Sequence, residues 1–333
     1  MTARLQALGL SLILVAGCAR EPEGGDTGKG RDTDTVTTTP YSDETTPETD
    51  TDTDTTTVPA FDCTTVPTVP QAVETIDIYT EEDFDFDLQG YLVYQSLQDI
   101  VGRNQYGGFK VISADVSSDA AGIQTLANGD IVVAAPDSGV IKYVDRETGA
   151  NHALIGGLSF PNGLESGAGN IVYFTELSGD RVRSIDTVTL VEETISSKIS
   201  SPNGLAFGPG EATLYVVGSV GADSVVMAID RVGDLWDVPR EIIRSDVSFD
   251  GVETDICGNV YVTEFSTGRL LRFDPVTGIN TELADIVGGG SFSSMRWGNG
   301  IGGWDTETLY VTNRNDIFAI HAGVPGNTDP LDP

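Results

Sequence analysis

Short apolar runs alternate with polar, glycine-rich turns through most of this chain. The runs are rich in Val, Ile, Tyr and Phe, which is typical of short buried β-strands, and no helical period of useful length appears. Six of the runs follow a hairpin turn marked by Gly, Asn or Asp. They are Tyr91–Tyr94, Ile131–Ala134, Ile171–Phe174, Leu214–Val217, Val260–Thr263 and Leu309–Thr312. The pattern predicts an all-β fold built from six similar units.

One phrase is repeated with small changes ahead of three of these runs. The copies are Phe160-Pro-Asn162-Gly-Leu164, Ser201-Pro-Asn203-Gly-Leu205 and Phe249-Asp250-Gly-Val252. Repeats of roughly 40–50 residues made of short strands are the signature of β-propeller blades. Equivalent positions in successive blades face the same axis, so we expect Asn162, Asn203 and Asp250 to converge as oxygen donors. Each Asn-Gly or Asp-Gly pair is expected to precede the inner strand of its blade.

The repeat predicts a six-bladed β-propeller over residues 61–333. The last blade has no obvious fourth strand after Ile317–His321, whereas the run Val73–Tyr79 at the other end of the propeller is strand-like. We expect this N-terminal strand to complete the last blade and close the ring, because closure removes exposed sheet edges.

The first sixty residues are not expected to belong to the propeller. An apolar run after Arg4 is too short to span a bilayer and predicts a signal peptide over residues 1–17. Its ending, Leu14-Val-Ala-Gly-Cys18, resembles the bacterial lipobox, which implies a lipidated Cys18 and a place in the bacterial cell envelope at the outer membrane. An ordinary secretory signal with an incidental cysteine is the alternative. Residues 18–60 are rich in Thr and Asp and predict a disordered linker.

Charge narrows the possible partners. The chain carries 51 acidic and 18 basic residues, a formal net charge of −33, which argues against nucleic acid and against direct contact with anionic lipid. We therefore expect no nucleic acid, membrane contact only through the lipid anchor, a monomer and a small-molecule substrate. Oxygen donors from Asn, Asp and Glu suit a hard cation such as Ca²⁺ or another divalent ion. The only histidines, His152 and His321, give little support to zinc or triad chemistry.

Two cysteines, Cys63 and Cys257, remain after the predicted cleavage. In an oxidising compartment they can pair, which would join the end of the linker to blade five. Two unpaired thiols are the alternative, and we expect the disulfide.

These segments resemble the senescence-marker-protein/gluconolactonase (regucalcin-like) family of six-bladed propellers over about residues 75–333. The resemblance rests on Ser201–Gly210 before Leu-Tyr-Val, on Asp250–Val262 and on Gly298–Asp305. In that family one divalent metal is held by a Glu of blade one, Asn of blades three and four, and Asp of blade five. The resemblance implies the metal ligands Glu82, Asn162, Asn203 and Asp250.

The chain departs from the family pattern at two places. Glu82 is followed by Asp83 instead of Gly-Pro, so Asp83 competes with it for the blade-one position. A substrate-binding Arg that family lactonases carry two residues before the blade-three Asn is Phe160 here, which makes the pocket mouth more apolar. Arg296, Trp297 and Asn299 are the other residues expected to line this substrate pocket. Glu176 and Glu264, after the second strands of their blades, are expected to be solvated loop residues.

Two functions fit these expectations. In the first, the protein is a surface-anchored, calcium-dependent hydrolase of a lactone or ester, in which Asp250 is the catalytic proton acceptor. In the second, the ion only stiffens a non-catalytic propeller lipoprotein that binds a ligand or protein. We expect the enzyme. A bound calcium with an open coordination position facing a pocket would favour it, whereas a site closed by protein ligands would favour the structural role. Propellers host both functions, and fold alone does not separate them.

Overall fold

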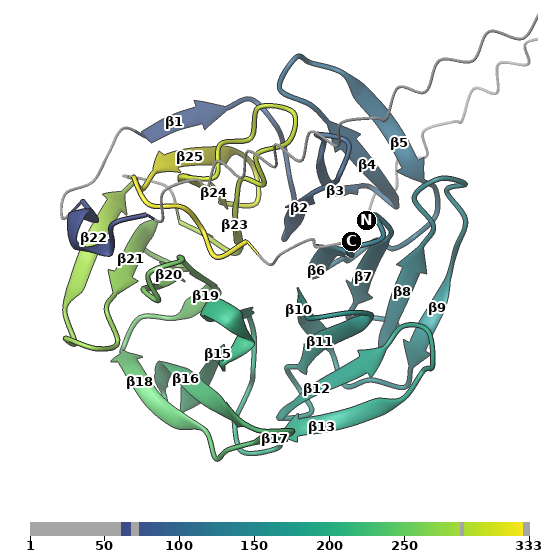
Figure 1. Ribbon diagram of the computed structural model, residues 1–333. Coiled ribbons are helices and arrows are strands. Elements are labelled where there is room, and N and C mark those ends of the chain that lie inside the picture. The colour runs from purple at the N-terminus through teal and green to yellow at the C-terminus, as the bar shows by residue number, and fades with distance from the viewer. Residues whose placement is uncertain (1–60, 68–72, 287–289, 329–333) are drawn as a thin grey trace, which may run out of the picture. The chain divides into compact units, whose positions relative to one another are not determined.

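The computed structural model describes residues 61–67, 73–286 and 290–328. The expected signal peptide, Cys18 and the linker lie outside these residues. The described part is an all-β, six-bladed propeller, as the sequence predicts, and its sheets surround a central axis (Figure 1). Its helices are two single 3-10 turns, Cys63–Thr65 and Pro209–Glu211. Within the described residues no helix is long and apolar enough to cross a membrane.

Each blade is an antiparallel sheet, and in the first three blades the strands follow one another in chain order from the axis outward. Blade one contains β2 (Phe84–Phe86), β3 (Leu92–Ser96), β4 (Asp99–Arg103) and β5 (Phe109–Ser113). Blade two contains β6 (Gly122–Thr125), β7 (Ile131–Ala135), β8 (Val140–Val144) and β9 (Asn151–Gly156). Blade three contains β10 (Pro161–Ser166), β11 (Ile171–Glu176), β12 (Arg181–Asp186) and β13 (Glu192–Ser196).

The second half of the ring repeats this order with two variations. Blade four contains β14 (Leu205–Phe207), β15 (Thr213–Val220), β16 (Asp223–Val232) and β18 (Arg240–Ser245), and the short β17 (Leu235–Trp236) pairs with the end of β16. Blade five contains β19 (Phe249–Thr254), β20 (Val260–Glu264), β21 (Arg269–Phe273) and β22 (Asn280–Asp285). Blade six contains β23 (Met295–Trp297), β24 (Thr308–Thr312), β25 (Ile317–His321) and β1 (Val73–Ile76).

The N-terminal strand closes the ring, as expected. β1 pairs antiparallel with β25, from Val73 opposite Ile320 to Ile76 opposite Ile317, and is shorter than the predicted Val73–Tyr79. An apolar cluster then joins blade six to blade one, where the Phe86 ring lies 4.9 Å from that of Trp304. Five further apolar clusters fill the other blade junctions. The core is therefore distributed between blades, and each blade depends on its neighbours for burial.

The turns between first and second strands follow the sequence signals. Gly129 has φ +87° and Gly258 has φ +82°, a left-handed backbone that glycine adopts without strain. These positions explain why Asn-Gly and Cys-Gly steps mark the predicted hairpins.

Cys63 and Cys257 form a disulfide in the structure, with their Cα atoms 5.6 Å apart. The bond joins residues separated by 194 positions and ties the segment ahead of β1 to the turn between β19 and β20. Because it closes a long loop, removing it by Cys63→Ser should lower the free energy of unfolding by roughly 2–5 kcal/mol. Denaturant titration measures the loss, and labelling the denatured, unreduced protein should find neither thiol free. Labelling of both thiols would contradict the pairing.

Candidate functional site

One cavity at the entrance end of the inner strands is lined by all four predicted metal ligands. Glu82 lies in the loop before β2, Asn162 in β10, Asn203 in the loop before β14 and Asp250 in β19. All six blades contribute lining residues, and the cavity volume is about 340 Å³ including its open mouth. The structure therefore brings together four oxygen-bearing side chains that are up to 168 positions apart in the chain.

Local backbone irregularities direct two of these side chains toward the cavity. The pairing of β10 with β11 shifts between Pro161 and Leu164, and the pairing of β19 with β20 shifts between Phe249 and Val252. A β-bulge at such a shift re-aims the side chain it carries. We expected each Asn-Gly or Asp-Gly pair to precede the inner strand of its blade. This is correct for Asn203, but wrong for Asn162 and Asp250, which lie inside β10 and β19.

The glycine that follows Asn162, Asn203 and Asp250 is required by packing and not by a turn. A Cβ atom on these glycines would collide with a carbonyl oxygen of the next blade, because neighbouring inner strands are so close. The collisions would be at 2.5 Å between Gly163 and Asn203, 2.6 Å between Gly204 and Asp250, and 2.8 Å between Gly251 and Ser293. The repeated phrase therefore reflects the close packing of neighbouring inner strands around the axis.

Threonines of the second strands hold the ligand-bearing backbone in place, and the sequence analysis missed them. The Thr175 hydroxyl accepts a hydrogen bond from the Gly163 amide at 2.9 Å and donates to the Asn203 carbonyl at 2.8 Å. Thr263 accepts from the Gly251 amide at 2.8 Å in the same way. Their equivalent place at the end of each second strand, one residue before a Glu, is the sequence signal that could have identified them.

The two carboxylates of the site repel each other in a poorly solvated place. Burial raises the pKa of Asp250 well above its usual range, the charge of Glu82 raises it further, and a hydrogen bond from Asn203 Nδ2 to Asp250 Oδ1 at 2.6 Å opposes the shift. Burial also raises the pKa of Glu82, and Arg314 partly offsets it. A cation between these groups would favour their charged forms.

Arg314 is a site residue that the sequence analysis did not find. Its Nε lies 2.9 Å from Glu82 Oε2, and its half-exposed side chain lines a second cavity that also includes Glu82 and Asn162. The residue sits in the loop between β24 and β25 with a left-handed φ of +68°. No repeat marks this position, because the corresponding loops of the other blades differ in sequence.

Asp83, the competitor of Glu82, already has other partners. Its Oδ2 accepts a hydrogen bond from the Ile123 amide at 2.7 Å and lies 3.6 Å from the Arg296 guanidinium. Its Oδ1 accepts a hydrogen bond from the Ser294 hydroxyl. The Glu82 carboxylate instead contacts Arg314 at the mouth, and its charge acts more strongly than that of Asp83 on the pKa of Asp250. Glu82 is therefore the better blade-one ligand.

The donor set fits a hard divalent cation. Two carboxylates and two amides supply oxygens and a formal charge of −2, and Asn203 directs its amide nitrogen to Asp250. No group of three or more His, Cys, Asp or Glu forms a metal cluster within residues 61–67, 73–286 and 290–328. An ion here would thus depend on the amide oxygens of Asn162 and Asn203 as well as the carboxylates.

An outer cavity opens beside this site and shares Glu82 and Asn162 with it. Its volume is about 790 Å³ including the mouth, and its lining includes Phe160 and Arg314. Phe160 is 40% exposed and has φ +58°, a strained conformation for an aromatic residue that tends to persist at functional sites. The structure places Phe160 where the sequence predicts it, at the mouth.

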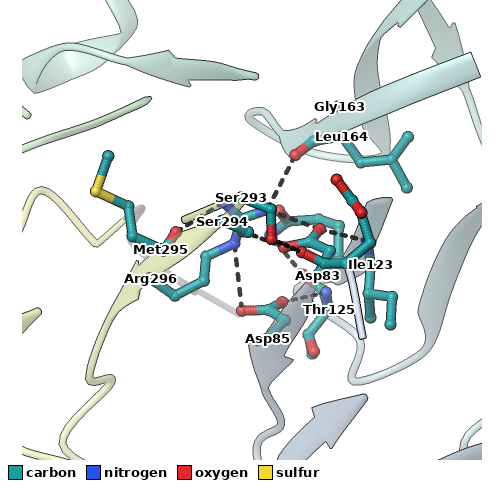
Figure 2. A network of polar contacts seen from close by, with 12 residues as sticks. Asp83, Asp85, Ile123, Thr125, Gly163, Leu164, Ser293, Ser294, Met295 and Arg296 are labelled. Atoms are coloured by element: carbon teal, nitrogen blue, oxygen red, sulfur yellow. Dashed lines mark hydrogen bonds and ion pairs between the residues drawn. The ribbon is translucent and has the colours of Figure 1, made fainter. Parts of the chain in front are cut away.

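Arg296 does not line this mouth but lies deeper, in a buried charge cluster (Figure 2). Its guanidinium lies 3.1 Å from Glu253, 3.6 Å from Asp83 and 4.0 Å from Asp85. Burial alone would lower the pKa of Arg296, but Asp83, Glu253 and Asp85 raise it above its usual value. Burial raises the pKa of Asp85 to about 6, although Arg296 opposes the shift.

Trp297 and Asn299 lie farther along the axis than the sequence analysis expected. They line a different cavity with Asp85, Gln124 and Thr125, at the end of the inner strands opposite Asp250. The expectation that they share the substrate mouth with Phe160 is wrong, because β23 runs along the axis and carries each later residue away from the entrance. Among the described residues, Arg296 alone lines both this cavity and the predicted metal site.

Glu176 and Glu264 are not solvated, contrary to expectation. Glu176 is fully buried and Glu264 is 3% exposed. The Glu176 carboxylate lies 3.1 Å from the Arg183 guanidinium and accepts a hydrogen bond from the Ser159 amide at 2.7 Å. The Glu264 carboxylate lies 2.5 Å from the Arg269 guanidinium. Both carboxylates join the second strand to its neighbours, a role that sequence position alone does not indicate.

Comparisons with known proteins agree with the resemblance seen in the sequence. Residues 185–315 match the SMP-30/Gluconolactonase/LRE-like region. No curated protein sequence matches the chain.

Solved structures share the fold at low sequence identity. A gluconolactonase from Xanthomonas campestris is 19% identical, with a TM-score of 0.62 over 76% of this chain and 90% of that one. A calcium-binding protein, regucalcin, from Agrobacterium tumefaciens is 17% identical, with a TM-score of 0.61 over 78% of this chain and 98% of that one. A luciferin-regenerating enzyme is 14% identical, with a TM-score of 0.61 over 77% and 97%. The chain thus has the six-bladed propeller fold of these proteins, and its residues 185–315 carry the sequence pattern of the SMP-30/gluconolactonase/LRE-like region.

Proposed function

We propose that this protein is a calcium-dependent hydrolase of a lactone or ester, anchored in the bacterial cell envelope through Cys18. The observation that carries the proposal is the convergence of Glu82, Asn162, Asn203 and Asp250 on one cavity beside a larger open one. Structural relatives described as gluconolactonases and as a calcium-binding protein support it.

Calcium held by Glu82, Asn162, Asn203 and Asp250 would polarise the carbonyl of the substrate and lower the pKa of an attacking water. Asp250 is the group in the site that is placed to accept the proton of that water. Its carboxylate is buried and lines the same cavity as the other three predicted ligands. The hydrogen bond from Asn203 fixes the orientation of this carboxylate.

The outer cavity is the place for the substrate. Phe160 offers an exposed aromatic face at the mouth, and Arg314 offers a cation near Glu82. Phe160 stands where family lactonases can carry an arginine, so an acyl compound with an apolar part fits this mouth better than a bare sugar lactone.

A panel of lactones and esters tests the proposal. Turnover of at least one substrate, lost with a chelator and restored by calcium, is the expected result. If calcium binds but no compound in the panel is hydrolysed, the non-catalytic binding propeller replaces the enzyme.

Arg314 should weaken calcium binding in the native protein. Its guanidinium pairs with Glu82 and repels a nearby cation, so Arg314→Gln should raise calcium affinity about two- to fivefold, the size expected for a half-exposed ion pair. Calorimetric titration of both proteins measures the change. Arg244→Gln is the matched control, because Arg244 pairs with exposed acids on blade four. Unchanged or weaker binding in Arg314→Gln would show that Arg314 does not compete with the ion.

A further inference from the structure

The outer cavity, which the proposed function assigns to the substrate, is rich in carboxylates. Besides Glu82 it is lined by Glu81, Asp119 and Asp137, and Arg314 is the one basic residue among the described residues that line it. Glu81 lies in the loop before β2, Asp119 in the loop between β5 and β6, and Asp137 in the turn between β7 and β8. Three separate loops therefore place negative charge on the same cavity.

This negative charge remains when a calcium ion is counted. The two charges of calcium are balanced by Glu82 and Asp250, the carboxylates of its proposed ligand set. The other three carboxylates of the outer cavity then face the single guanidinium of Arg314, which leaves two negative charges in excess. The net charge of the whole chain, −33, attracts cations in the same way. An anionic substrate is therefore repelled from this cavity, and a cationic one is attracted.

The three carboxylates are accessible from the cavity. Asp137 is exposed, and Asp119 and Glu81 are partly exposed. Asp119 Oδ2 accepts a hydrogen bond from the Asp137 amide, and Asp119 Oδ1 accepts one from the Ser117 hydroxyl at 2.7 Å. These bonds tie the loop before β6 to the turn after β7, so that the two aspartates lie close together on the cavity wall.

The same cavity presents an aromatic ring on a fixed backbone. Phe160 is exposed, and its carbonyl accepts a hydrogen bond from the Leu177 amide at 3.0 Å. The amide of the preceding residue, Ser159, donates to the buried Glu176 carboxylate at 2.7 Å. An aromatic face attracts a cation, and it suits an alkylated ammonium group better than a metal ion because the alkyl groups pack against the ring.

We propose that the outer cavity selects substrates that carry a positively charged alkylammonium group, such as esters of choline. This inference rests on the proposed function, because it takes the outer cavity to be the substrate site. The ammonium group lies against the Phe160 ring and the three carboxylates, and the carbonyl of the ester lies toward the calcium ligands.

Choline binding to the calcium-loaded protein tests the proposal without requiring hydrolysis. The comparison is 3,3-dimethylbutanol, which has the shape of choline but no charge. Calorimetric titration should give choline an affinity about fivefold or more above that of the neutral alcohol, the size expected for a cation–π contact together with exposed charges. The difference should shrink as salt is added, because salt screens exposed charges. Binding of the neutral alcohol as tight as that of choline, or no binding of either, would overturn the proposal.

Three variants locate the bound cation. Asp137→Asn and Glu81→Gln each remove one charge and should weaken choline binding about two- to threefold, without changing the affinity for the neutral alcohol. Phe160→Leu should weaken choline binding about two- to fivefold. The matched controls are Asp234→Asn, in the turn between β16 and β17, and Phe109→Leu on β5, which are exposed residues outside the cavity. Choline affinity equal to that of the controls in all three variants would place the cation elsewhere and overturn the proposal.

Hydrolysis of the matching acetate esters separates this inference from the proposed hydrolase. Water adds its hydroxide to the acyl carbon, the bond from that carbon to the alcohol oxygen breaks, and Asp250 passes the proton to that oxygen. We expect kcat/KM for acetylcholine to exceed that for 3,3-dimethylbutyl acetate by about fivefold or more. Equal turnover of both esters would overturn the preference for a cation and leave the hydrolase standing. Selective choline binding with no turnover of any ester or lactone would support the preference and contradict the hydrolase.

Discussion

Asp250→Asn should lose both calcium binding and hydrolysis. The substitution keeps the shape of the side chain but removes one of the two charges of the ligand set and the proposed proton acceptor. We expect activity to fall by about 100-fold or more, the usual contribution of a positioned base, and calcium heat to disappear in titration. Asp246→Asn is the matched control, because Asp246 is exposed and only four residues away. Retained activity in Asp250→Asn would contradict the role of Asp250.

The pH dependence of stability shows whether Asp250→Asn loses calcium binding and activity through its missing carboxylate or through misfolding. The pKa of Asp250 is raised in the folded protein, so with chelator present the folded state holds this proton more tightly than the unfolded state does. The stabilisation is present at low pH and is lost as pH rises through the raised pKa. Asp250→Asn removes this contribution. We therefore expect the chelated variant to lose less stability between pH 5 and pH 8 than the chelated native protein.

Arg296→Met should destabilise the propeller by about 3–5 kcal/mol, because it leaves several buried carboxylates without their cation. Arg296 lies against Asp83, Asp85 and Glu253 in the interior of the ring. Denaturant unfolding at constant calcium measures the loss. Arg244→Met removes exposed ion pairs instead and should change the free energy of unfolding by no more than about 1 kcal/mol.

The size of the Arg296→Met effect should depend on pH. Asp85 has a pKa of about 6 with Arg296 present, and removing the guanidinium that lowers it would raise it further. A carboxyl whose pKa is raised by folding is tolerated when protonated and destabilises when ionised. The defect should therefore be smaller at pH 5 than at pH 8. A variant as stable as the native protein at pH 8 would show that the carboxylates do not need Arg296.

The repeat made the fold and three of the four candidate ligands predictable. Equivalent places in a closed ring must face one axis, so Asn162, Asn203 and Asp250 could be placed together from spacing alone. The close approach of Gly163 to the carbonyl of Asn203 shows the physical reason for the repeated phrase. Glu82 needed the family resemblance, because no repeat marks it.

Residues outside the repeat could not be predicted in the same way. Arg314 reaches the site from a loop whose left-handed backbone has no counterpart in the phrase, and its pairing with Glu82 joins blades six and one. Glu176 was expected to be solvated because the sequence shows that the residue is charged but does not show which residues pair with it. Its burial depends on Arg183 of the next strand. Trp297 and Asn299 were both misplaced at the mouth, because their positions in the sequence do not show how far along the axis they lie.

Calcium titration of the chelator-treated protein tests the central claim most directly. If Glu82, Asn162, Asn203 and Asp250 form one ion site, calorimetry should show one calcium bound per chain, a rise in melting temperature with calcium, and weaker binding in Asn162→Ala than in the native protein. His152→Gln should bind as the native protein does, because His152 does not line the cavity. The absence of both heat and melting shift in the native protein would contradict the metal site and, with it, the proposed hydrolase.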